Sequence, residues 1–136
     1  MKAPKWIAPL FWLAAVYDGV LGFLFMAAPN LPFEVFGVTP PNHPGYVQFP
    51  AALLVIFALM FAVVALDPVR NRNLIPYGIL LKVAYCSVAS LHWLTIGIPA
   101  MWKPLVVVDL VMGLLFVWAY VALAPRSESA EEQTTT

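Results

Sequence analysis

The chain has 136 residues, of which 62% are hydrophobic and only 10% are charged. Its mean hydropathy is +0.87. A soluble core of this length could not bury so much apolar surface, so the composition predicts a protein surrounded by lipid. The formal net charge is zero, and the basic residues form no stripe that would neutralise phosphates, which argues against nucleic acid as a partner.

Four apolar segments follow one another along the chain, at residues 6–27, 50–66, 74–95 and 105–123. Each is close to the ~20 residues that a helix needs to cross ~30 Å of hydrocarbon. Backbone polar groups cannot stay unpaired in lipid, and the segments lack the alternating pattern of barrel strands. The sequence therefore predicts an all-α fold, an integral membrane four-helix bundle that forms one domain over residues 1–124.

The connection between the first two spans is rich in proline, and the chain ends in a polar segment. We expect residues 29–49 to form a proline-rich outer loop, with a short amphipathic helical turn over residues 31–37 that ends at Gly37. Residues 125–136 are mainly polar and charged and are predicted to be a disordered tail. The loop prolines are Pro29, Pro32, Pro40, Pro41 and Pro44.

The basic residues near the span ends are distributed unequally. Lys103 is the only one on its side of the predicted bundle. The positive-inside rule then places both termini in the cytoplasm and the proline-rich loop outside. The basic residues of the cytoplasmic side are Lys2, Lys5, Arg70, Arg72 and Arg126.

Asp18 and Lys82 are ionisable residues inside predicted spans, where an unpaired charge is costly. Counted along the helical rise, they differ in depth by ~6 Å, which the lysine stem can bridge. We expect an ion pair that is either a structural strut or part of a ligand or proton site, although Lys82 alone reaching the interface is also consistent with its position. Tyr17 and Tyr85 lie at similar depth and could donate hydrogen bonds to Asp18.

His92 and Asp109 are the other two ionisable residues in the spans, and both are expected near the outer surface. A carboxylate that accepts from an imidazole fixes the tautomer of the ring, so this pair is the candidate catalytic base. Lys82, Tyr85 and His92 share one helix face, which we assign to the bundle interior.

His43 in the outer loop raises a weaker possibility, a metal site that His43 and His92 would form with Glu34 and Asp109. The alternative is that His43 is an ordinary turn residue, because its spacing resembles no known metal motif. Cys86, the only cysteine, lies in an apolar run and is interpreted as a packing residue. No sequence motif specifies a cofactor.

The four-span plan, the segment from Asp18-Gly19 to Gly22 and the proline-rich loop together resemble the DoxX-like group of small bacterial membrane proteins. The resemblance covers most of the chain in outline and implies a bacterial inner-membrane protein. Some members of that group are linked to quinone or thiosulfate oxidation. No motif carries a residue of that group onto a position of this sequence.

Two functions are favoured by the sequence over a third, a proton or solute carrier, because four helices alone leave little room for alternating access unless the protein oligomerises. The first is a binding protein or accessory subunit that packs against other membrane subunits or a second copy, with the ionisable residues as internal struts. The second is an outward-facing membrane oxidoreductase or lipophilic-ligand site, in which His92 is the base, Asp109 orients it, and Asp18 with Lys82 binds a polar head such as a quinone carbonyl.

Overall fold

The structure, a computed structural model, describes residues 2–125, so the predicted tail from residue 126 onward lies outside the described residues. In the described part all regular secondary structure is helical. The elements are α1 (Ile7–Ala27), α2 (Leu31–Val35), α3 (Gly45–Leu66), the 3-10 helix η1 (Arg72–Leu74), α4 (Ile75–Thr95) and α5 (Lys103–Ala122). Four of these helices, α1, α3, α4 and α5, are long and apolar enough to cross a membrane, and each contains or nearly matches a predicted span.

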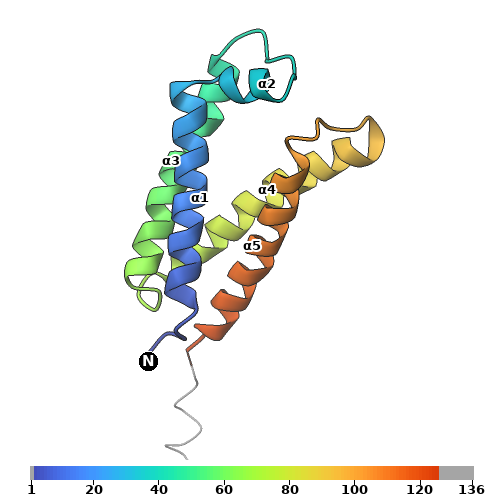
Figure 1. Ribbon diagram of the computed structural model, residues 1–136. Helices are drawn as coiled ribbons and strands as arrows, with labels where there is room; N and C mark the ends of the chain where they lie inside the picture. The colour runs from blue at the N-terminus through green and yellow to red at the C-terminus, as the bar shows by residue number, and fades with distance from the viewer. Residues whose placement is uncertain (1, 126–136) are drawn as a thin grey trace, which may run out of the picture.

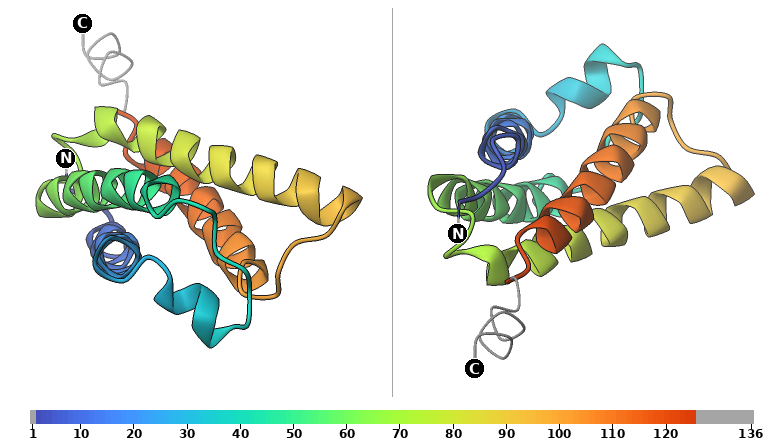
Figure 2. Two further views of the ribbon diagram at one scale, coloured as in Figure 1. Left: turned by 90° about the horizontal axis from the view of Figure 1, so that it is seen from above. Right: turned by 90° about the horizontal axis from the view of Figure 1, so that it is seen from below.

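The helices form two antiparallel pairs, because α1 packs along α3 and α4 packs along α5. In Figure 1 the α4–α5 pair leans away from the α1–α3 pair, so the pairs lie closer at the end that holds residues 2 and 125 than at the end that holds α2. Both views in Figure 2 show α4 and α5 diverging toward the connection at residues 96–102. The bundle is therefore closed at one end and splayed at the other.

The start of α3 differs from the prediction, since the helix begins at Gly45 and not at Pro50. A proline lacks the N–H for the hydrogen bond to the carbonyl four residues earlier, which is why Pro50 looked like a helix start. Two hydrogen bonds outside the helical pattern hold the first turn of α3 in place. The Gly45 N–H donates to His43 Nδ1 at 2.9 Å, and the Gln48 side chain donates to the Met26 carbonyl at 3.2 Å.

The connection between α1 and α3 contains the short helix that the sequence predicts. α2 covers Leu31–Val35, and Gly37 follows with a φ of 66°. Such a left-handed conformation is accessible to glycine without a Cβ clash, so Gly37 ends the turn as expected. Phe33 of α2 is buried beneath the loop, with its ring centroid 6.1 Å from that of Phe25.

Two apolar clusters hold the helices together. At the closed end the Phe116 ring of α5 stacks on Phe11 of α1 at 4.8 Å and lies 5.2 Å from Phe61 of α3. At the splayed end Phe25 and Phe33 pack with Trp102 at ring distances of about 6 Å. The level between these clusters holds the buried charges.

The outward faces of the long helices are covered with large apolar side chains. Phe23 of α1 is 68% exposed, Leu59 of α3 is 65% exposed and Leu114 of α5 is 64% exposed. An exposed apolar surface of this extent is typical of a protein whose neighbours are lipid tails or other membrane helices.

Candidate functional site

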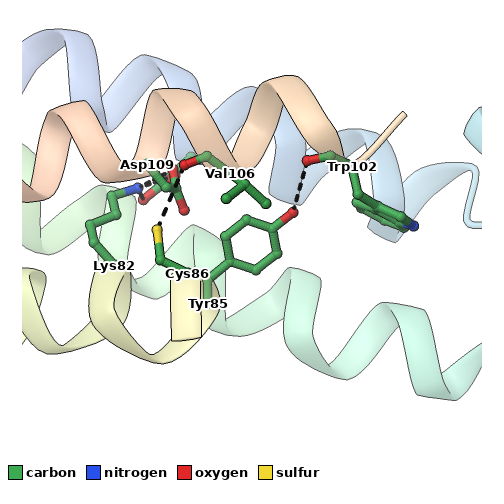
Figure 3. A network of polar contacts seen from close by, with 7 residues as sticks. Lys82, Tyr85, Cys86, Trp102, Val106 and Asp109 are labelled. Atoms are coloured by element: carbon green, nitrogen blue, oxygen red, sulfur yellow. Dashed lines mark hydrogen bonds and ion pairs between the residues drawn. The ribbon is translucent and has the colours of Figure 1, made fainter. Parts of the chain in front are cut away.

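Three charged side chains from three helices meet in the middle of the bundle. Lys82 Nζ of α4 lies 3.2 Å from Asp18 Oδ1 of α1 and 3.0 Å from Asp109 Oδ1 of α5. It is also 3.3 Å from Asp18 Oδ2. The exposed fractions of the three side chains are 2%, 2% and 11% for Lys82, Asp18 and Asp109. Figure 3 shows the lysine extending from α4 toward the carboxylate on α5.

A glycine one helical turn away accompanies each of these charges. A Cβ on Gly113, four positions after Asp109, would lie 3.2 Å from Lys82 Cβ, so the bare α5 backbone lets the lysine stem pass. A Cβ on Gly78, four positions before Lys82, would lie 2.6 Å from the Phe61 ring. Small residues let helix backbones approach closely in a membrane. At Gly113 this close approach lets Lys82 of α4 reach Asp109 of α5, while at Gly78 it brings α4 against α3.

The cluster is incompletely satisfied in its hydrogen bonds. The ammonium group uses its donors on Asp18 and on one oxygen of Asp109, and the other Asp109 oxygen has no hydrogen-bond partner among the described residues. The Tyr17 hydroxyl is buried and likewise has no partner there. A buried polar group without a partner costs about 1–3 kcal/mol.

Two neighbouring polar groups bond to backbone carbonyls of α5 and the residue before it. The Tyr85 hydroxyl donates to the Trp102 carbonyl over a long 3.5 Å, and the Cys86 thiol donates to the Val106 carbonyl at 3.7 Å. Figure 3 shows both contacts beside the charged cluster. The packing role predicted for Cys86 agrees with its position between α4 and α5.

A cavity of about 710 Å³ lies above the cluster, between the two helix pairs. Its walls come from α1 to α5 and from the loop before α3, and most of the lining side chains are apolar. The exceptions with ionisable or phenolic groups deep in the bundle are Tyr17, Asp18, Tyr85 and Asp109. Lys82 does not line this cavity. It borders a smaller one of about 350 Å³ between α4 and α5, which Asp109 also lines.

The structure corrects the predicted pairing of His92 with Asp109. Asp109 bonds to Lys82, whereas His92 is exposed near the end of α4. The prediction measured depth from the helix ends and assumed that α4 ends level with the start of α5. The last turns of α4 instead diverge from α5 (Figure 2), so equal distances from the two ends do not mean proximity.

The residues of the predicted metal site do not lie together in the structure either. The described residues contain no group of three or more His, Cys, Asp or Glu side chains that could hold a metal ion. His43 is exposed and accepts the Gly45 N–H, as expected for a turn residue.

The structure thus pairs Asp18 with Lys82 as predicted and adds Asp109, which the sequence assigned to a different partner. The predicted hydrogen bonds from Tyr17 and Tyr85 to Asp18 are wrong. The Tyr17 hydroxyl has no partner among the described residues, and the Tyr85 hydroxyl lies nearer the start of α5 and donates to the Trp102 carbonyl. Gly113, four positions after Asp109, was the sequence signal that another helix approaches α5 near this carboxylate. Comparison with known proteins finds no matching family, no matching curated protein and no matching solved structure. The DoxX-like resemblance therefore stays a prediction.

Proposed function

We propose that this chain is a multi-pass membrane protein that binds a small lipophilic molecule with a polar head in the cavity between its helix pairs. One observation carries the proposal: an apolar cavity of about 710 Å³ ends on a buried charged cluster, next to a hydroxyl that has no hydrogen-bond partner within residues 2–125. Small-molecule sites are typically concave and apolar, with a few polar groups that fix orientation, and this volume is in their usual range.

The polar end of the cavity favours binding over a purely structural role. A strut needs its polar groups paired with one another, and yet Tyr17 Oη and one oxygen of Asp109 lack partners in the described residues. A ligand head that bonds to the buried Tyr17 hydroxyl would recover the energy lost on burying it. The second Asp109 oxygen would offer the same head another acceptor. The oxidoreductase alternative loses support, because Asp109 does not orient His92.

The proposed site would face outward from a bacterial inner membrane. The bundle end that holds residues 2 and 125 also carries Lys2, Lys5, Arg70 and Arg72 (Figure 1). The cavity extends toward the other end, where residues 38–41 and Pro99 line it. The positive-inside rule assigns the first end to the cytoplasm. In a Cys86→Ala background, an impermeant maleimide added to intact cells should label Thr39→Cys and leave Asn73→Cys unlabelled, and the reverse pattern would refute this orientation.

Ligand binding is tested by filling the cavity. Leu105 lines it from α5, whereas Val107 on the same helix is 54% exposed and borders neither cavity. We expect native mass spectra of the wild-type protein and Val107→Trp to retain a bound small molecule, and those of Leu105→Trp to lose it by at least tenfold. Equal occupancy in the two variants, or no bound molecule in any of them, would contradict the proposal.

A second candidate, an accessory subunit, is favoured by the end of α4. Residues 91–97 are all exposed, with Leu94 at 85% and Ile96 at 84%, and His92 adds a polar group to this surface. A polar side chain that faces lipid is costly, and a partner helix or a second copy would cover it. The same native spectra would then contain a second chain, and a monomer with only small-molecule ligands would exclude this role.

A further inference from the structure

The cavity presents carboxylates to its contents and keeps its ammonium group behind them. Asp18 and Asp109 line the large cavity, and Lys82 does not. The lysine reaches both carboxylates from the α4 side, with Nζ 3.2 Å from Asp18 Oδ1 and 3.0 Å from Asp109 Oδ1. A molecule in the cavity therefore meets acceptors and negative charge before it meets the cation.

The charges of the cluster do not balance. With its groups ionised, one ammonium faces two carboxylates, so the cluster carries one excess negative charge. The described residues place no other Lys, Arg or His within salt-bridge distance of Asp18 or Asp109. An uncompensated charge in a low-dielectric interior is strongly unfavourable. Either a proton on one carboxylate or a cation that enters the cavity would neutralise it, and an ammonium head supplies both a charge and hydrogen-bond donors.

The remaining groups of the cavity suit a protonated amine on an apolar body. Tyr17 Oη and the second Asp109 oxygen can each accept a hydrogen bond, and an ammonium head offers several donors. Further out, Phe25, Phe33 and Trp102 pack with ring centroids about 6 Å apart and line the cavity. Aromatic side chains pack against an apolar chain, and the faces of their rings attract a cation.

Other head groups fit less well. A carboxylate or phosphate head would add negative charge next to Asp18 and Asp109. Lys82, the one cation beside them in the described part of the chain, already spends its donors on these two carboxylates. A hydroxyl or carbonyl head could bond to Tyr17, but it would leave the excess charge in place. On the basis of the proposed ligand cavity, we propose that its ligand class is lipophilic amines, whose ammonium group binds Asp109 and Tyr17.

The test compares ligands of one chain length and different head charge. Dissociation constants for dodecylamine, dodecanol and dodecanoate are measured with the full chain in phosphatidylcholine nanodiscs, and binding to empty nanodiscs is subtracted. We expect the amine to bind at least tenfold more tightly than the alcohol, and the carboxylate to bind more weakly than both. An alcohol or carboxylate that binds as tightly as the amine would overturn the assignment.

Two variants distinguish the contribution of the Asp109 charge to binding from that of the cavity's shape. Asp109→Asn leaves one ammonium and one carboxylate, so it should weaken amine binding at least tenfold. The dissociation constant of dodecanol should stay within about twofold of the wild-type value, which would also show that the cavity is intact. If that variant does not fold, Tyr17→Phe, which removes one oxygen, should weaken amine binding severalfold, and an unchanged constant would contradict the proposed contact. If Leu105→Trp abolishes binding of all three ligands equally but the wild type shows no preference for the amine, the cavity stands and the amine assignment fails.

Discussion

Lys82→Met is expected to lower the free energy of unfolding by about 3–5 kcal/mol, the usual cost of removing one partner from a buried ion pair. The substitution leaves Asp18 and Asp109 facing each other without the ammonium that lies 3.2 Å and 3.0 Å from them. The stability is measured by denaturation of the detergent-solubilised protein with sodium dodecyl sulfate, followed by far-UV circular dichroism.

The control for this prediction is a neutral cluster. Asp18→Asn, Lys82→Met and Asp109→Asn combined leave no buried charge, so the triple variant should be more stable than Lys82→Met alone, because neutral replacement of a buried ionic group is often tolerated. Lys5→Met, at an exposed lysine, should leave the stability nearly unchanged. If Lys82→Met is as stable as Lys5→Met, the three charges do not form a mutually dependent cluster.

The four helices could be predicted from the sequence because each apolar run is long enough to cross a bilayer. In lipid the backbone N–H and C=O groups can be fully hydrogen-bonded only in a helix or a closed barrel. The Asp18–Lys82 contact followed from the same reasoning, since two charges at similar depth in lipid must find partners. Both predictions depend on local composition and helical rise, which need no knowledge of how the helices cross.

The third member of the cluster and the cavity depend on that crossing. Asp109 meets Lys82 because α5 passes α4 at Gly113, and His92 is left exposed because the end of α4 diverges. Neither crossing angle nor splay is encoded in the length of an apolar run. The cavity likewise arises from the separation of the helix pairs. Its lining side chains come from five helices and from the two connections that precede α3 and α5, and the lining residues of any single segment form no recognisable sequence motif.

Gly22→Ala is expected to destabilise the α1–α3 pair by about 1–3 kcal/mol, the range for an overpacked core. A Cβ at this position would lie 2.8 Å from the Ala51 carbonyl oxygen and 2.8 Å from Val55 Cγ2. Because the first of these is a backbone atom, no rotamer change relieves the contact and the helices must separate. The measurement is the same denaturation by sodium dodecyl sulfate.

Gly19→Ala is the matched substitution, because Gly19 lies three positions before Gly22 in the same α1–α3 interface. Its Cβ would lie 3.5 Å from Ala58 Cβ, an ordinary contact, and alanine is the better helix former. Gly19→Ala should therefore be as stable as the wild type or slightly more stable, and equal losses in the two variants would show that close backbone approach at Gly22 is not what holds α1 to α3. Since Ala51 also lines the cavity, a separation there would weaken ligand binding in Gly22→Ala and spare it in Gly19→Ala.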